Sequence, residues 1–368
     1  MSEDIPRGSR FLHSDDPFDF HLGGTLARIS LAYETWGELN SARDNGVMIL
    51  TGLSPSAHAA RHPENNEDGW WEPMVGPGKP IDTNRFFVIC INSLGSCKGS
   101  TGPASINPES GKPWRLEFPQ VTVQDIASSA TRVIDHLGID QLLAVVGPSL
   151  GGMSGLAWLQ QNPGRARHFL SISTAAAAEP FAIAIRSLQR ECIVSDRLWL
   201  DGKYSDDERP ATGMRLARKL GMLSYRSPQE MTQRFGRREE VMFEHYRFGM
   251  DFAIESYLER AAVKFVGGFD PCCYLYLSYA LDLFDASEGY DSLEEAVAPI
   301  VLDSKMVIGV KTDILWPLHQ QSQLANAFKA NGVKTEFLTL DSIQGHDSFL
   351  VDYDRFLPAV DAYLKTIK

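Results

Sequence analysis

The chain has 368 residues, of which 43% are hydrophobic, and a formal net charge of −12 at pH 7. This length allows one large α/β domain with an insertion, or two modest domains. The negative charge argues against nucleic acid or an anionic membrane as the main partner, because both would repel the average surface. A soluble metabolic enzyme fits these properties.

The sequence lacks the signals of secretion, membrane insertion and metal binding. Residues 1–20 have neither the basic start nor the apolar stretch of a signal peptide, and no window approaches the roughly 20 apolar residues of a membrane-spanning helix. The five cysteines form no CxxC pair and no paired Cys/His spacing of a zinc site. We therefore expect a cytoplasmic protein with no metal and no bound cofactor.

Strand and helix patterns alternate along most of the chain. Apolar runs bounded by turn residues predict buried strands at 29–36, 47–53, 86–94, 142–146 and 169–173, with a helix over 122–137. The same rhythm returns near the C-terminus, with strands at 306–310 and 335–340 and helices over 317–330 and about 354–367. This alternation predicts a mostly parallel sheet with helices on both faces.

The segment between these two parts has a different character. It is charged, aromatic and helical in pattern, with no convincing buried strand. We therefore expect an α/β core made of residues 1–177 and 300–368, carrying a helical cap of residues 178–299.

A nucleophile motif lies between a predicted strand and a predicted helix. Gly147-Pro148-Ser149-Leu150-Gly151 reads G-x-S-x-G, the nucleophile elbow of the α/β-hydrolase fold. The two glycines are needed because a Cβ in so tight a turn would collide with the neighbouring strand or helix. The pattern alone could arise by chance, so the identification of Ser149 as nucleophile depends on its partners.

Two later residues complete a triad in the chain order serine, acid, histidine. Asp313 follows the strand at 306–310, and His346 follows the strand at 335–340. The alternative for Asp313 is a helix cap or an exposed loop carboxylate. His58 is the competing base, but a structural or substrate-lining role suits it better.

Main-chain donors are also needed to stabilise the oxyanion of the reaction. The backbone N–H of Leu150 and, from the loop after an early strand, that of Leu53 are the expected pair. With the triad, these groups predict transfer of an acyl group through Ser149.

Longer blocks of the sequence resemble the homoserine O-acyltransferase family of α/β-hydrolase-fold enzymes. They include LTGLSPSAHAA, NSLGSCKGSTGPASINPESGKPW, VVGPSLGGMSGLAW and GHDSFL. The resemblance implies ping-pong transfer from an acyl-CoA to the hydroxyl of an amino acid, in a homodimer built through the cap. It places the acceptor-binding arginine on Arg218 and the amine-binding aspartate on Asp347. For Arg218 the alternative is a solvated position on a charged helix.

Two departures from the family pattern bear on the substrates. The chain reads Gly52-Leu53-Ser54-Pro55 where the family usually reads close to TGDSH, which favours a short acceptor such as serine. Arg186 replaces the asparagine of the family's AFNEVQR, and its guanidinium could pair with the distal carboxylate of a succinyl group. Both departures resemble the serine O-succinyltransferase branch, which implies succinyl-CoA and L-serine as substrates, in cysteine biosynthesis.

Three other functions remain open from the sequence. The same chemistry could act on homoserine with acetyl-CoA or succinyl-CoA, in methionine biosynthesis. The same triad also occurs in ester hydrolases. A scaffold reused only for binding is the least favoured, because such chains commonly lose a triad member and this one keeps all three.

Overall fold

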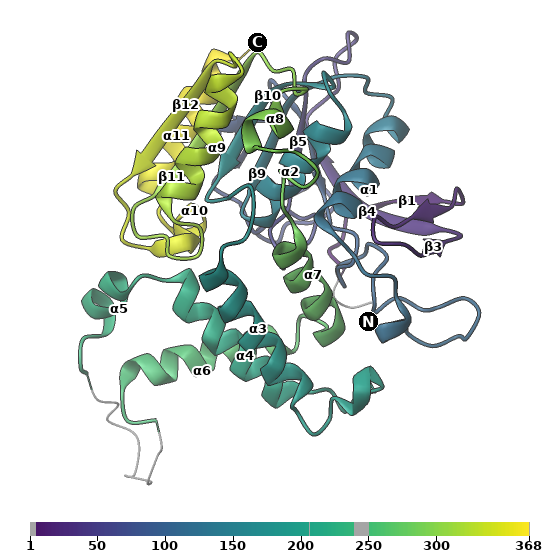
Figure 1. The fold of residues 1–368 in the computed structure, drawn as a ribbon, viewed down its shortest axis with the longest axis vertical. Coiled ribbons are helices and arrows are strands. Elements are labelled where there is room, and N and C mark those ends of the chain that lie inside the picture. Colours follow the sequence, from purple (N-terminus) through teal and green to yellow (C-terminus); the bar gives the residue numbers. More distant parts are fainter. Residues whose placement is uncertain (1–4, 206, 239–249, 368) are drawn as a thin grey trace.

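The computed structural model describes residues 5–205, 207–238 and 250–367. Its centre is an 8-stranded sheet of order β1-β4-β8-β5-β9-β10-β11-β12 (Figure 1). The strands from β8 to β12 in this order pair in parallel, whereas β4 pairs antiparallel with both β8 and β1. The mostly parallel sheet predicted from the sequence is confirmed.

The strands of this sheet follow the predicted apolar runs, except for the edge strand β1, which was not predicted. They are β1 (Arg10–Ser14), β4 (Ile29–Trp36), β5 (Gly46–Leu50), β8 (Phe87–Ile91), β9 (Leu142–Pro148), β10 (Ala166–Ile172), β11 (Ser304–Val310) and β12 (Thr335–Leu340). Two short ribbons accompany them, formed by β2 (Phe18–Asp19) with β3 (Thr25–Leu26) and by β6 (Val75–Gly76) with β7 (Ile81–Asp82).

Helices cover both faces of the sheet, and each face has its own hydrophobic core. One core contains apolar side chains of α1 (Val123–His136), α2 (Leu150–Gln161) and α9 (Leu318–Ala330), and the other those of α11 (Tyr353–Thr366). Helix α1 begins at a capping box, in which Thr122 accepts the N–H of Asp125 and Asp125 accepts the N–H of Thr122. Shorter helical segments are η2 (Arg115–Glu117), η3 (Leu200–Gly202), α8 (Leu293–Val297), η4 (Gly345–Asp347) and α10 (Ser348–Val351).

The chain between β10 and β11 contains a separate group of helices. They are α3 (Pro180–Val194), α4 (Ala211–Tyr225), α5 (Pro228–Phe235), α6 (Ala253–Val266) and α7 (Pro271–Leu283), and Figure 1 shows them below the sheet. The two ends of this segment meet at a bridge between Ala177 and Asp285. The cap bounds of 178–299 stay a prediction, and residues 206 and 239–249 within them lie outside the described part.

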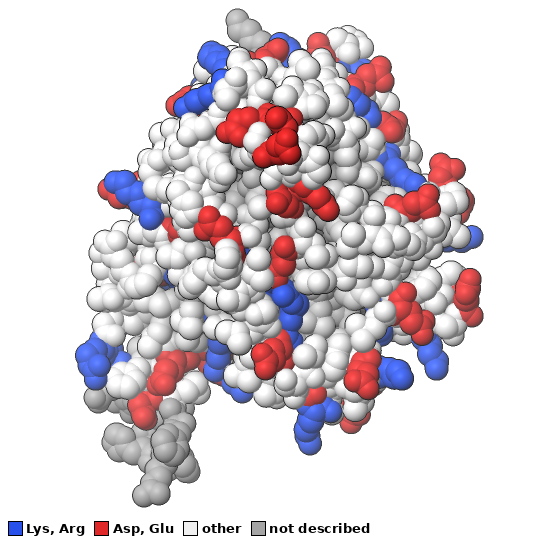
Figure 2. All heavy atoms as spheres, in the orientation of Figure 1, with Lys and Arg blue, Asp and Glu red and all other residues white. Residues whose placement is uncertain are grey.

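Charged groups on the face drawn in Figure 2 are scattered and of both signs. An acidic cluster lies at the place where Figure 1 draws α8, whose first turn carries Glu294 and Glu295. No helix among the described residues has the length and apolar content needed to cross a bilayer.

Candidate active site

Ser149 lies in a sharp turn between β9 and α2. Its φ of 53° and ψ of −124° are rarely adopted by a residue with a side chain, and such strain is typical of functional sites. A Cβ on Gly147 would lie 2.2 Å from the carbonyl oxygen of Gly151, and one on Gly151 would lie 2.0 Å from that of Leu50. Both glycines are therefore required for the turn that presents Ser149.

The structure brings Ser149, Asp313 and His346 together in a hydrogen-bonded row. His346 Nε2 is 2.9 Å from Ser149 Oγ, and His346 Nδ1 is 2.9 Å from Asp313 Oδ2. Because a carboxylate only accepts hydrogen bonds, the ring proton belongs on Nδ1, which leaves Nε2 free to accept the serine proton. The three residues follow β9, β11 and β12, whose carboxyl ends lie at the same edge of the sheet.

Asp313 is fixed on both of its oxygens. Oδ2 accepts the bond from His346, while Oδ1 accepts the backbone N–H groups of Leu315 and Trp316, each at 2.9 Å. The side chain of Asp313 is fully buried. It therefore holds the imidazole in one orientation, and the alternative of an exposed loop carboxylate does not apply.

The protonation of His346 is set by opposing effects. Burial disfavours the imidazolium, but the charge and hydrogen bond of Asp313 and the charge of Asp347 outweigh it. The pKa of His346 therefore lies above its ordinary value, although the positive charge of Arg186 acts in the opposite direction. A base of raised pKa accepts the serine proton more readily.

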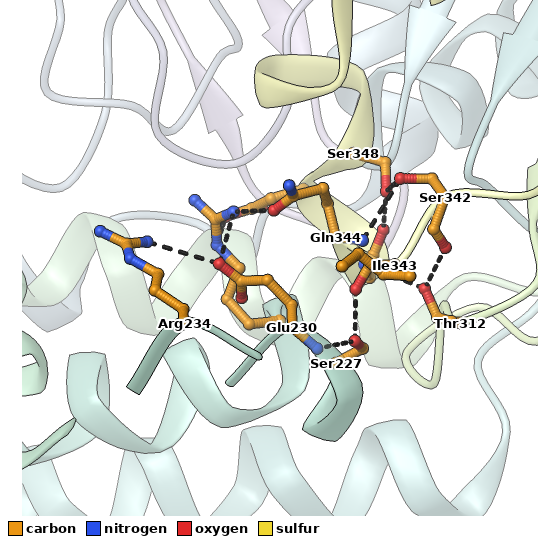
Figure 3. A network of polar contacts seen from close by, with 11 residues as sticks. Ser227, Glu230, Arg234, Thr312, Ser342, Ile343, Gln344 and Ser348 are labelled. Carbon is orange, nitrogen blue, oxygen red and sulfur yellow. Dashed lines mark hydrogen bonds and ion pairs between the residues drawn. The ribbon is translucent and has the colours of Figure 1, made fainter. Parts of the chain in front are cut away.

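The loop that carries His346 is fastened on two sides (Figure 3). Thr312, from the loop that follows β11, donates to Ser342 O at 2.7 Å and accepts the N–H of Gly345 at 3.1 Å. From the opposite side, Ser227 at the start of α5 donates to Ile343 O and accepts the N–H of Glu230. The histidine loop is therefore attached both to the sheet and to α5.

A cavity opens at Ser149 and His346, and four other predicted features of the site line it. Three of these are the single residues Arg186, Arg218 and Asp347, and the fourth feature is the 52–55 loop, which brings the total to seven residues. Helices α3 and α4 thus supply two cations to a cavity that Ser149 and His346 also line. An anionic or zwitterionic substrate suits this environment.

Arg186 is anchored through its Nε, while its two terminal nitrogens make no hydrogen bond to the described residues. Its Nε is 2.5 Å from Asp282 Oδ1, and its guanidinium lies over the ring of Trp316 at 5.0 Å. Arg186 is 4% exposed, yet Nη1 and Nη2 have no hydrogen-bond partner within the described residues. Two buried, unpaired donors are costly unless a ligand accepts from them.

Arg218 and Asp347 face the same cavity from different elements. Arg218, on α4, stacks over the rings of Phe265 and Tyr225 at 4.5 and 5.5 Å, so it is not a freely solvated side chain. Asp347 is 18% exposed at its side chain and lies 3.6 Å from Arg226 Nε through Oδ2. One cation and one anion thus flank the cavity beside the triad.

Comparison with known proteins gives relatives over the whole chain. Residues 47–353 match the family model described as alpha/beta hydrolase fold. Serine O-succinyltransferase of Stenotrophomonas maltophilia (strain K279a) is 52% identical over 370 residues, with both chains fully covered. L-serine/homoserine O-acetyltransferase of Streptomyces lavendulae is 50% identical over 373 residues, again with full coverage of both. The crystal structure of homoserine O-acetyltransferase from Bacillus anthracis superposes with a TM-score of 0.90, at 28% identity and 98% coverage of each chain.

This chain belongs to the homoserine O-acyltransferase family. It has the α/β-hydrolase fold and is an acyltransferase, as the sequence blocks predicted. Within the family, the Stenotrophomonas protein is a member of the serine O-succinyltransferase branch. The resemblance drawn from the sequence is therefore confirmed.

Of the two predicted oxyanion donors of this acyltransferase, Leu150 follows Ser149 directly and Leu53 lines the same cavity as Ser149. Leu150 is the first residue of α2, so its N–H has no carbonyl partner within the helix. Leu53 lines the cavity with Gly52, Ser54 and Pro55. Their role as oxyanion donors stays a prediction.

His58, the competing base, is occupied elsewhere. Its Nδ1 is 2.8 Å from Glu34 Oε2 and its Nε2 is 3.0 Å from Glu67 O. Glu34 is fully buried, and although burial disfavours a charged His58, the bond to Glu34 raises its pKa overall. The structure gives His58 structural partners, and His58 is not among the residues that line the cavity of Ser149 and His346.

Sequence reasoning missed several residues that line or support the cavity. Gln189, Tyr225 and Trp316 line it, and Asp282 holds Arg186. Gln189 had a signal in the sequence, because a residue three positions after Arg186 lies on the same face of a helix. The described residues contain no group of three or more His, Cys, Asp or Glu side chains that could hold a metal ion.

Proposed function

We propose that this acyltransferase moves a succinyl group from succinyl-CoA to the hydroxyl of L-serine, giving O-succinyl-L-serine. The observation that carries the proposal is the pair of unpartnered Arg186 nitrogens in the cavity of Ser149. A succinyl thioester bound at Ser149 ends in a carboxylate, and a guanidinium binds a carboxylate through two parallel N–H groups. An acetyl group has no distal carboxylate and cannot form this interaction.

The first half of the reaction acylates Ser149. Its Oγ attacks the thioester carbonyl carbon while its proton passes to His346 Nε2, and the backbone N–H groups of Leu53 and Leu150 stabilise the oxyanion. When the tetrahedral intermediate collapses, the carbon–sulfur bond breaks and CoA leaves with the proton from His346. Asp313 stabilises the imidazolium while it exists.

The second half transfers the acyl group to the amino acid. The acceptor hydroxyl gives its proton to His346 Nε2 and attacks the ester carbonyl carbon. The bond to Ser149 Oγ breaks, and the serine regains its proton from His346. Arg218 binds the acceptor carboxylate and Asp347 its ammonium, so that a zwitterion is held across its α-carbon.

The choice of L-serine over homoserine rests on the 52–55 loop. Gly52, Leu53, Ser54 and Pro55 line the cavity, and this sequence is bulkier than the family's usual pattern. A narrower acceptor pocket would place the hydroxyl of L-serine within reach of the acyl-enzyme carbonyl, whereas the longer side chain of L-homoserine would not fit in the same position. The serine O-succinyltransferase relative supports this reading, whereas the homoserine O-acetyltransferase neighbour fits the alternative.

A matrix of two donors and two acceptors tests the proposal. Purified protein is assayed by CoA release with succinyl-CoA or acetyl-CoA, in the presence of L-serine or L-homoserine. The proposal expects the highest kcat/KM for succinyl-CoA with L-serine. Higher kcat/KM for homoserine would favour the methionine-pathway alternative, and CoA release at full rate without any amino acid would favour a hydrolase.

The proposed setting of the reaction follows from the family. We place it in the cytoplasm, in cysteine biosynthesis, with succinyl-CoA as co-substrate and no bound cofactor or metal. The cap, residues 178–299 on a core of 1–177 and 300–368, shields the acyl-enzyme from bulk water until the amino acid arrives. We also propose a homodimer built through the cap, which light scattering of the purified protein would test.

A further inference from the structure

Gln189 lies one turn after Arg186 on the same face of α3. It is 1% exposed, and it lines the cavity that contains Ser149, Arg186 and Arg218. A buried amide on the same helix face as the Arg186 guanidinium makes this wall of the cavity polar. Its orientation decides whether it offers a donor or an acceptor.

Tyr274 of α7 fixes the orientation of this amide. Its hydroxyl is 2.9 Å from Gln189 Oε1. Burial holds the pKa of Tyr274 well above its ordinary value, so the hydroxyl keeps its proton and donates it. The carbonyl side of the amide therefore faces Tyr274, and the NH₂ group points away from it.

The NH₂ group of Gln189 packs against Gly221 of α4 and has no hydrogen-bond partner among the described residues. No hydrogen bond from Nε2 is made to any described residue, since the amide's only side-chain bond is the one to Tyr274. On α4, a Cβ at Gly221 would lie 3.0 Å from Nε2, so the glycine leaves room for the amide. Gln189 thus keeps an N–H donor of fixed orientation without a partner among the described residues, and it lines the same cavity as Arg186, one helical turn away.

Arg186 and Gln189 are supported as one unit by the same helix. Asp282 holds the first and Tyr274 the second, and both belong to α7. Arg218 is instead stacked on Tyr225 and Phe265. Because α7 supports both Arg186 and Gln189, their donors suit a single acceptor group of a ligand. Arg218 is then available for a different group.

We propose that Gln189 is a donor-binding residue that acts together with Arg186, its amide N–H binding the distal carboxylate of the succinyl group beside the guanidinium. The family pattern AFNEVQR has the same glutamine, so Gln189 contributes to the choice of succinyl-CoA only in combination with Arg186. This inference rests on the proposed succinyl transfer. A carboxylate has about four lone-pair sites, and Arg186 can fill only part of them because Asp282 occupies its Nε. The amide donor of Gln189 satisfies another without adding charge.

The test compares Gln189→Met, which removes the donor at similar length, with Gln189→Glu, which replaces it by a negative charge of the same shape. Acylation of Ser149 is followed in single turnovers, with succinyl-CoA and with butyryl-CoA, its neutral four-carbon counterpart. We expect Gln189→Met to lower kcat/KM for succinyl-CoA about tenfold. Gln189→Glu should lower it about a hundredfold or more, because like charges then face each other. Both should change butyryl-CoA by less than about twofold.

Two further variants separate specificity from packing. Gln320→Met alters another buried glutamine, which lies on α9 and donates to Ala177 O, and it should leave the ratio of the two donors unchanged. Tyr274→Phe frees the amide to turn, so it should weaken succinyl-CoA use less than Gln189→Met does and add nothing in the double variant. Equal loss with both donors in Gln189→Met would overturn the inference, as would a change confined to the KM for L-serine.

Arg186→Asn distinguishes failure of this inference from failure of the proposed function. If Arg186→Asn leaves the preference for succinyl-CoA intact, the donor assigned under the proposed function is wrong. If Arg186→Asn abolishes the preference and the Gln189 variants keep it, only the role of Gln189 is wrong. Thermal unfolding of each variant checks that the comparison is made on folded protein.

Discussion

Replacing Arg186 by asparagine restores the residue usual in the family and removes one charge from the acyl-donor side of the cavity. The fold should survive, because Asp282 keeps a second partner, Arg190 Nη1 at 2.7 Å from Oδ2. The substitution should instead weaken binding of the acyl donor, because the succinyl carboxylate would lose its two proposed charge-assisted hydrogen bonds from Nη1 and Nη2. In a buried site these contribute about 3 kcal/mol, or roughly a hundredfold in kcat/KM.

Single-turnover acylation with succinyl-CoA and butyryl-CoA measures this loss. The rate with succinyl-CoA should fall by the full factor, while the rate with butyryl-CoA should change little. Arg186 also lowers the pKa of His346, so the variant should raise that pKa. Because the base works in its neutral form, the acid limb of the butyryl-CoA profile should move to higher pH. The same loss with both donors, or none with succinyl-CoA, would refute the assigned role.

Three other substitutions test separate parts of the site. Asp347→Asn should raise the KM for L-serine about tenfold without slowing acylation, and should move the acid limb to lower pH, because Asp347 helps to raise the pKa of His346. His58→Ala should lower the free energy of unfolding, measured with denaturant, by about 3–5 kcal/mol, because it leaves the buried Glu34 without its histidine partner. The folded fraction should still become acylated. Loss of acylation in that fraction would show that His58 takes part in the reaction. Gly151→Ala should abolish the folded state, seen by circular dichroism, because its Cβ would lie 2.0 Å from a main-chain oxygen of β5; a folded, active variant would show that the turn tolerates a side chain.

The parts of the fold that rest on local pattern could be predicted from the sequence. The strands predicted at 29–36 and 335–340 have the bounds of β4 and β12, because apolar runs between turn residues are typical of buried strands. The triad positions followed from chain order, since each member lies in the turn or loop that follows a parallel strand. The edge strand β1 was missed, because Arg10–Ser14 pairs antiparallel and is largely exposed, so it has no continuous apolar run.

The supporting contacts of the site could not be predicted, because they join distant segments. Asp282 is 96 residues from Arg186, and Tyr274 is 85 residues from Gln189. Nothing in the local sequence shows that α3 and α7 lie against each other in the order that brings these pairs together. Sequence could therefore identify Arg186 as a candidate, but only the packing shows which of its nitrogens are free.

The central claim is that Ser149 carries a succinyl group between two substrates. Intact-mass measurement after brief mixing with succinyl-CoA, without any amino acid, tests it most directly. We predict a mass increase of one succinyl group that is absent in Ser149→Ala and disappears on addition of L-serine, with O-succinyl-L-serine as product. An unmodified protein that nevertheless forms this product, or an adduct that persists in Ser149→Ala, would contradict transfer through Ser149.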